Sequence, residues 1–169
     1  MKIAKQTFTT RFTLVSLLLA SVVLSSCGPS RGEVTSDTTI GYCPVCGMKV
    51  NASDPWAAEI YYTDRTKLMF ESPGDMLAFY TSPKSYEASD THKDRANIER
   101  ILVKDYQSKQ ATDGQHAVFV YKSNINGPMG ADFLPFSKRA DAEAFVAANG
   151  GTIVSLSEVT GDMARDLRK

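Results

Sequence analysis

Cysteine is scarce in this chain of 169 residues, which contains three. Cys27 stands at the end of an N-terminal leader, so Cys43 and Cys46 are the thiols left to the folded part. Two thiols cannot build a disulfide framework, and they allow at most one local disulfide or one metal site. Cysteine chemistry is therefore expected at this pair.

A surplus of basic residues is also missing, because 19 Lys and Arg are matched by 19 Asp and Glu. Loss of the leader would remove Lys2, Lys5 and Arg11 but no acidic residue, which leaves a net charge of about −3. Nucleic-acid binding needs a basic surface that neutralises phosphates, and this composition offers none. We therefore expect no nucleic-acid partner.

Long apolar runs are confined to the leader. Residues 12–24 are mostly apolar and uncharged, and they are too few to span a bilayer as a stable helix. The run ends in Leu-Ser-Ser-Cys at 24–27, the pattern of a bacterial lipobox. It predicts a signal peptide over 1–26 and lipidation of Cys27, with an uncleaved N-terminal anchor as the alternative. Either reading predicts an exported protein, membrane-anchored in the cell envelope and facing the periplasm or the outer surface.

Small polar residues dominate 28–40, so 27–42 is expected to form a flexible tether that begins with the lipidated Cys27. The rest of the chain is long enough for one ordinary domain or two small ones. Its patterns indicate the α+β class, with two similar β-β-α-β units packed together over 43–110 and 111–169.

The first unit is expected to hold strands over 56–62, 67–70 and 98–106, and a helix capped by Ser72 that has Pro73 at its first position and runs to Tyr80. The second is expected to hold strands over 117–121, 133–136 and 152–156, and a helix capped by Ser137 that runs to Ala148. Both units are thus expected to have the same order of elements: strand, strand, helix, strand.

A matched spacing supports the duplication. Phe70, Asp75, Ala78 and Phe79 are separated by the same intervals as Phe136, Asp141, Ala144 and Phe145. Both acids would lie in the first turn of a helix, near the positive end of its dipole. For them a structural role is favoured over a catalytic one.

The segment Cys43-Pro44-Val45-Cys46-Gly47-Met48 carries the chemistry. Thiolates and thioethers are soft donors, which select Cu(I) over Mg²⁺ and Ca²⁺. Cys46 and Met48 are two residues apart, so in an extended backbone both side chains would lie on one face and converge on one ion. Met48 as the first apolar residue of a buried strand is the competing interpretation.

A second candidate donor is Met129, in the turn Gly127-Pro128-Met129-Gly130. A thioether at a loop tip is a plausible further ligand, although the side chain would also be explained by packing on a small core. His92 and His116 are the two histidines, and each is interpreted as an ordinary surface or partly buried residue.

At these residues the chain resembles the NosL family of copper-binding lipoproteins. The resemblance extends from the lipobox through the Cys43–Met48 segment, residues 68–79 and 103–106, the Met129 turn with residues 135–136, and the helix end at 149–151. It implies two similar β-β-α-β units and a Cu(I) chaperone for the maturation machinery of nitrous oxide reductase. The family's Cys-x-Met motif falls on Cys46 and Met48, which leaves Cys43 as an additional thiol.

The predicted function is that of a non-enzymatic metallochaperone with Cu(I) bound by Cys43, Cys46, Met48 and Met129. Its predicted partner is the nitrous oxide reductase assembly complex of denitrification or a related exported copper enzyme. Two alternatives remain open. Cys43 and Cys46 would also suit a thiol-disulfide oxidoreductase, and together with histidines they would suit a structural zinc module.

Overall fold

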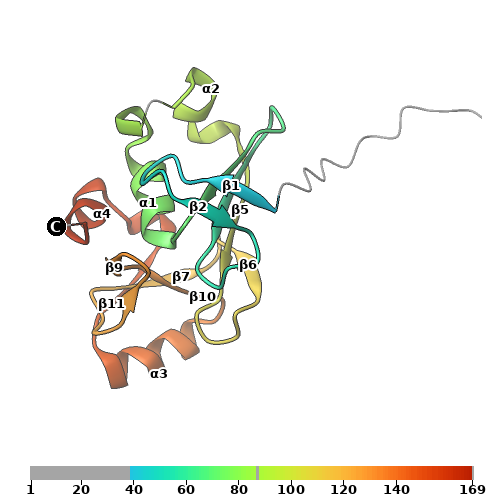
Figure 1. The fold of residues 1–169 in the computed structure, drawn as a ribbon. Helices are drawn as coiled ribbons and strands as arrows, with labels where there is room; N and C mark the ends of the chain where they lie inside the picture. The colour runs from blue at the N-terminus through green and yellow to red at the C-terminus, as the bar shows by residue number, and fades with distance from the viewer. Residues whose placement is uncertain (1–38, 87, 169) are drawn as a thin grey trace, which may run out of the picture. The chain divides into compact units, whose positions relative to one another are not determined.

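The computed structural model describes residues 39–86 and 88–168, which all belong to one compact unit (Figure 1). Helices and strands are mixed along the chain, which confirms the predicted α+β class. The predicted signal peptide, the predicted lipidation site Cys27 and most of the predicted tether lie outside the described residues. Among the described residues, no helix has both the length and the apolar character needed to cross a membrane.

A small hairpin opens the described part of the chain. Strand β1 (Ile40–Tyr42) pairs antiparallel with β2 (Lys49–Asn51), and the Cys-x-x-Cys segment makes the turn between them. This hairpin had not been predicted, because its strands are three residues long and too short to establish a period in the sequence.

The larger sheet has the strand order β4-β3-β5-β6. Its strands are β3 (Ala58–Tyr62), β4 (Lys67–Phe70), β5 (Ile98–Lys104) and β6 (Ala111–Asp113). Strand β3 begins two residues later than predicted, since the N–H groups of Trp56 and Ala57 bind the side chain and the carbonyl of Asp54 in a turn. Helix α1 (Pro73–Thr81) contacts β3 and β4.

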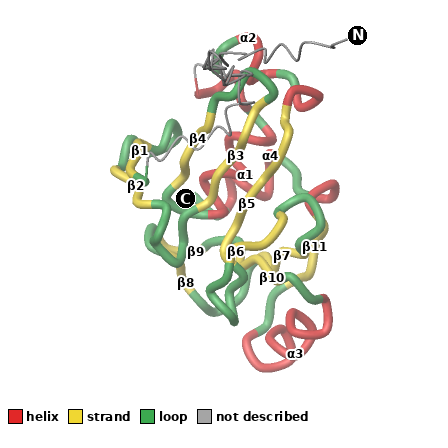
Figure 2. The backbone as a smooth tube through the Cα atoms, turned by 90° about the vertical axis from the view of Figure 1, so that its right-hand side faces the viewer, coloured by secondary structure: helices red, strands yellow, loops and turns green. Residues whose placement is uncertain are grey.

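The smaller sheet has the order β10-β7-β11, with β7 (Val118–Tyr121), β10 (Leu134–Phe136) and β11 (Thr152–Ser155). Helix α3 (Arg139–Asn149) packs on it and lies at the far end of the molecule from α2 (Figure 2). A two-residue hairpin, β8 (Asn126–Gly127) and β9 (Gly130–Ala131), presents the Pro128-Met129 tip.

Short helices complete the described chain. They are η1 (Pro83–Tyr86), α2 (Asp90–Lys93), η2 (Arg95–Asn97), η3 (Leu156–Glu158) and α4 (Gly161–Asp166). Helix α4 packs against α1, so the end of the described chain returns to the larger sheet's helix.

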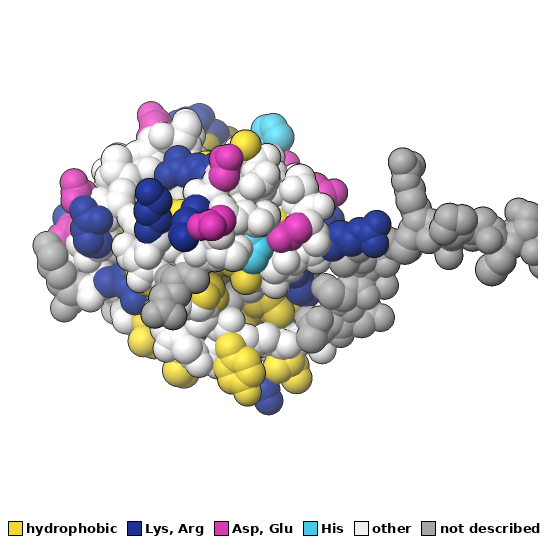
Figure 3. Space-filling view, turned by 90° about the horizontal axis from the view of Figure 1, so that it is seen from above, with side chains coloured by type: hydrophobic (Ala, Val, Ile, Leu, Met, Phe, Trp, Pro, Cys, Tyr) yellow, Lys and Arg dark blue, Asp and Glu magenta, His cyan; other side chains and the backbone are white. Residues whose placement is uncertain are grey.

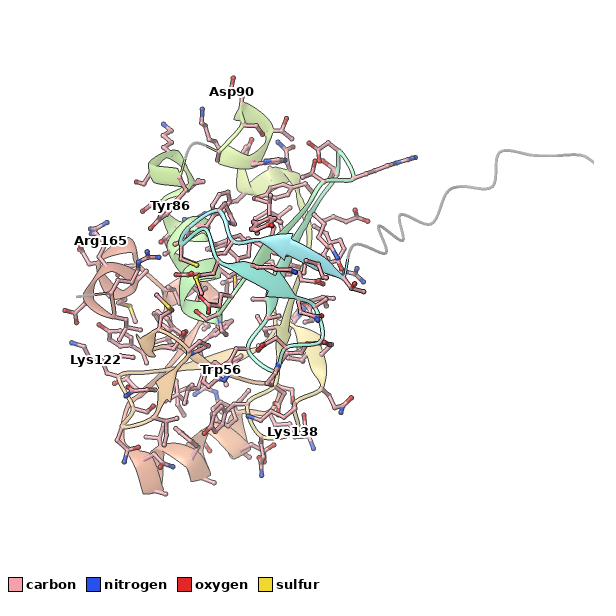
Figure 4. The ribbon with its side chains drawn as sticks, in the orientation of Figure 1. Trp56, Tyr86, Asp90, Lys122, Lys138 and Arg165 are labelled. Carbon is pink, nitrogen blue, oxygen red and sulfur yellow. The ribbon has the colours of Figure 1, made fainter. Side chains whose placement is uncertain are left out.

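In each sheet the strand that comes first in the chain is central: β3 between β4 and β5, and β7 between β10 and β11. One hydrophobic cluster nevertheless draws residues from both sheets, among them Ile60, Phe70 and Phe119. A second, smaller cluster around Leu134 and Phe136 lies under α3, and Trp56 (Figure 4) packs against it. The division into two duplicated units therefore stays a prediction.

The two predicted helix caps have different outcomes. Ser72 caps α1 as predicted, since its Oγ accepts the Asp75 N–H at 3.3 Å and Pro73 opens the helix. The prediction for Ser137 was wrong, because α3 begins one residue later with Lys138 at the cap position. Ser137 instead donates both its N–H and its hydroxyl to Asp105, at 2.7 and 2.9 Å.

Asp105 links the two sheets at the end of β5. Its other oxygen, Oδ1, accepts the N–H and the hydroxyl of Ser108 at 2.7 and 2.9 Å. Burial opposes ionisation of this carboxyl, but the hydrogen bonds from Ser108 and Ser137 outweigh it and lower the pKa of Asp105 from 3.8 to about 2.

Asp105→Asn is expected to destabilise the fold by about 2 kcal/mol at pH 7, because a neutral amide has one acceptor oxygen and cannot accept from all of these donors. The folded-state pKa is below the unfolded value, so the ionised carboxyl stabilises the fold above about pH 4, and this stabilisation is lost as the pH falls towards 2. Urea unfolding of both proteins at pH 7 and pH 3 measures the difference. A difference that does not shrink at pH 3 would contradict this account, and Asp141→Asn is the control.

Candidate metal centre

The Cys43–Met48 segment is a closed turn. Cys43 donates its N–H to the Met48 carbonyl and accepts the Gly47 N–H at its own carbonyl, both at 2.8 Å. Gly47 has φ of 75°, a left-handed conformation that glycine adopts without strain. This turn places both thiols on the inner side of the hairpin: Cys43 is 1% exposed and Cys46 is partly buried.

The two thiols meet a carboxylate from α1. The Sγ atoms of Cys43 and Cys46 and a carboxylate oxygen of Asp75 all lie within 4.8 Å of one another, close enough to hold a metal ion. Cys43 Sγ donates to Asp75 Oδ2 at 3.2 Å, and Cys46 Sγ donates to Glu71 Oε2 at 3.5 Å. Both thiols are free.

Sequence reasoning missed Asp75 as a member of this group. It correctly placed Asp75 in the first turn of α1, but the contact with Cys43 spans 32 residues and leaves no local signal. Arg168, also missed, donates from Nη1 to Asp75 Oδ1 at 2.7 Å across 93 residues. The carboxylate is thus held between a thiol and a guanidinium.

A cavity of about 450 Å³ opens beside the thiols. Its walls come from four parts of the chain, which include Cys46 in the hairpin turn, Asp75 in α1, and Arg168 after α4. The fourth part is the segment around β9, with Met129 and Asp132. The structure therefore brings three of the sequence-derived candidates, Cys43, Cys46 and Met129, to one region.

The two methionines predicted as copper ligands are exposed rather than packed in the core. Met48 is 47% exposed and Met129 is 63% exposed, so neither serves as a core residue. Figure 3 shows hydrophobic side chains gathered along one edge of the molecule, and Tyr42 and Met48 are both large exposed hydrophobics of the β1–β2 hairpin. The extended-backbone argument for Cys46 and Met48 was wrong, because Gly47 between them is left-handed. Their joint ligation stays a prediction.

Both histidines have other neighbours. His92 stacks on Tyr62, with ring centroids 4.3 Å apart, and its Nε2 lies 3.4 Å from Asp64 Oδ2. His116 Nδ1 lies 2.7 Å from Asp113 Oδ2. Neither belongs to the group of Cys43, Cys46 and Asp75, which agrees with their interpretation from the sequence.

The sequence model of the NosL family matches residues 34–164. The chain belongs to the NosL family. It is 29% identical to the copper-binding lipoprotein NosL of Achromobacter cycloclastes over 170 residues, which cover 90% of this chain and 81% of that protein. Its fold is similar to the crystal structure of the copper chaperone NosL from Shewanella denitrificans, with a TM-score of 0.60, 24% identity, and coverage of 73% of this chain and 92% of the other.

The electrostatics of this NosL-family site keep both thiols protonated. Burial raises the pKa of Cys43, although several backbone N–H groups partly oppose it. Burial also raises the pKa of Cys46, and the neighbouring Asp75 and Cys43 side chains add to the effect. Burial likewise raises the pKa of Asp132 to about 6. A catalytic thiol of disulfide exchange has a lowered pKa, so these thiols lack that activation.

We expect Cys43 and Cys46 to react with iodoacetamide at pH 7 at least about tenfold more slowly than the same thiols in the urea-unfolded protein. The rate should still rise up to pH 9, because the reactive thiolate forms only above the raised pKa. Peptide mass spectrometry reads the two thiols separately, and the more accessible Cys46 is the informative one. Fast, pH-independent alkylation of Cys46 above pH 7 would favour the oxidoreductase alternative.

Proposed function

We propose that this NosL-family protein binds Cu(I) and passes it to another exported protein. The observation that carries the proposal is that two free thiols, Cys43 and Cys46, lie together beside Asp75, and that Cys46 lines a cavity also lined by the exposed Met129. Soft sulfur donors in this number favour Cu(I). The copper named in both relatives supports the same ion.

Access to the site suits a carrier more than a store. Cys43 is buried, Cys46 is partly exposed, and Met48 and Met129 are exposed. The solvent exposure of the candidate donors therefore increases from Cys43 to the methionines. An acceptor's ligand would approach from the methionine side while Cys43 still holds the ion, and Cu(I) would pass by ligand exchange. A closed four-ligand cage offers no such path.

Arg168 reduces the negative charge that the site would carry with Cu(I) bound. Cu(I) with two thiolates carries one negative charge, and Asp75 adds another. Arg168, already paired with Asp75 at 2.7 Å, offsets one of them. We infer that Asp75 and Arg168 set the charge around the ion, while the sulfur atoms supply the bonds to copper.

The two alternatives receive less support. A disulfide-exchange motif opens a helix and has an activated thiol, whereas Cys43 and Cys46 lie in a hairpin turn and have raised pKa values. Structural zinc sites use four ligands, commonly two Cys or His pairs. Within the described residues, the candidate group supplies two thiols and the Asp75 carboxylate, with no histidine.

The location and the acceptor are part of the same proposal. Lipidation of Cys27 would anchor the chain in the cell envelope facing the periplasm, in line with the lipoprotein named for the Achromobacter relative. The acceptor would be the maturation machinery of nitrous oxide reductase or a related exported copper enzyme. No catalytic step is assigned to the chain.

Anaerobic Cu(I) titration against a chromogenic chelator tests the metal assignment. We expect tight binding of one Cu(I), weakened by about 100-fold or more in Cys46→Ser, because a charged donor is lost. Met48→Ala should weaken binding by about tenfold and Met129→Ala by less, since thioethers are neutral. Met163→Leu, which changes a partly buried methionine of the core, is the control.

Cu(I) affinity unchanged in Cys46→Ser would show that the site is wrongly assigned. Zn²⁺ binding tighter than Cu(I) binding would favour the structural zinc alternative. Loss of a disulfide-exchange activity in the same variant would favour the oxidoreductase.

Membrane anchoring is tested separately by Cys27→Ser in the full chain. We expect the wild type in the membrane fraction and the variant in a soluble or signal-peptide-bearing form, because a single site of acylation would be lost. Serine is the conservative replacement, so the Cu(I) affinity of the purified variant should stay within about twofold of the wild type. An unchanged membrane fraction with processed protein would contradict the lipidation of Cys27.

A further inference from the structure

Met129 lines the same cavity as Cys46 although it comes from a distant part of the chain, which requires something to hold it there. It lies at the tip of the β8–β9 hairpin, 63% exposed. A flexible, exposed thioether contributes little to metal binding unless its backbone is fixed, because ordering it on binding costs conformational entropy. The segment that fixes the hairpin is therefore relevant to the site.

Asp132, three residues after Met129, is buried to 4% exposure although it is a carboxylic acid. Its Oδ1 accepts the Gly74 N–H at 2.6 Å and the Phe133 N–H at 2.7 Å. Gly74 is the second residue of α1, whose first N–H groups have no partners within the helix. Asp132 thus satisfies a donor of the helix that carries Asp75.

Two glycines make room for this carboxylate. A Cβ atom at Gly74 would lie 2.6 Å from Asp132 Oδ1, and a Cβ atom at Gly127 would lie 2.8 Å from Asp132 Oδ2. Neither distance leaves room for a Cβ atom, so both positions require glycine because it has no side chain. Gly127 belongs to β8 and Gly74 to α1, which means that Asp132 is enclosed by the hairpin on one side and the helix on the other.

We propose that Asp132 is a positioning residue for copper: its contacts with Gly74 and Gly127 hold the β8–β9 hairpin on α1, and so hold Met129 at the cavity shared with Cys46 and Asp75. Asp132 itself does not bind the ion. This inference rests on the proposed Cu(I) function.

The test compares Cu(I) affinities of the full chain by chelator competition. Asp132→Ala should weaken Cu(I) binding as much as Met129→Ala does, by up to about tenfold, because the thioether is no longer held. Asp132→Asn should retain wild-type affinity within about twofold, since the amide oxygen still accepts both N–H groups. Asp105→Ala, which removes a buried acid away from the cavity, is the matched control and should leave affinity unchanged.

The decisive measurement is the double variant. If Asp132 acts through Met129, then Asp132→Ala in a Met129→Ala background should weaken binding by no more than about twofold further. A merely structural loss would weaken both backgrounds equally. Equal effects in the two backgrounds, or unchanged affinity in Asp132→Ala alone, would overturn the proposal while leaving Cu(I) binding by wild type intact.

Gly74→Ala provides a second route if Asp132→Ala does not fold. Alanine favours a helix, but its Cβ atom would displace the carboxylate, so Cu(I) binding should fall about as far as in Met129→Ala. Wild-type affinity in a folded Gly74→Ala protein would also overturn the proposal. Absence of Cu(I) binding by the wild type would instead overturn the proposed function itself.

Discussion

The backbone N–H groups in the first turn of a helix have no acceptors within that helix, and the site of this protein is built around one such turn. Ser72 accepts the Asp75 N–H, and Asp132 accepts the Gly74 N–H from another part of the chain. The same turn directs the Asp75 carboxylate towards Cys43 and Arg168. The start of α1 therefore serves as the common support for the Cys43–Met48 turn, the β8–β9 hairpin and the end of the chain after α4.

The sequence was informative wherever the determinant of structure is local. Strand β4 was predicted at its observed bounds, and Ser72 with Pro73 located the start of α1, because capping depends on residues three apart. Ser137 likewise precedes a helix in the sequence, but its hydroxyl donates a hydrogen bond to Asp105, 32 residues away. Where the local sequence allows a side chain two different partners, tertiary contacts decide which partner it binds, and a single sequence does not display those contacts.

The candidate site divides in the same way. The sequence singled out Cys43, Cys46 and Met129, which the structure brings to one region, because sulfur-containing side chains are rare and chemically specific. Asp75 and Arg168 were missed because carboxylates and guanidiniums are common, and their relevance comes from contacts across 32 and 93 residues. The hairpin turn was missed because Gly47 reverses the chain between residues that otherwise look like an extended run into a strand.

The enclosure of Asp132 by two glycines also has an evolutionary consequence. Gly74 and Gly127 lie 53 residues apart in numbering, yet each is limited by the same carboxylate. A mutation that adds a side chain at either position would be tolerated more easily after Asp132 had been replaced by a smaller residue. The three positions are therefore expected to change together during divergence, as one inherited unit, and relatives without an acid at position 132 would be free to lose both glycines.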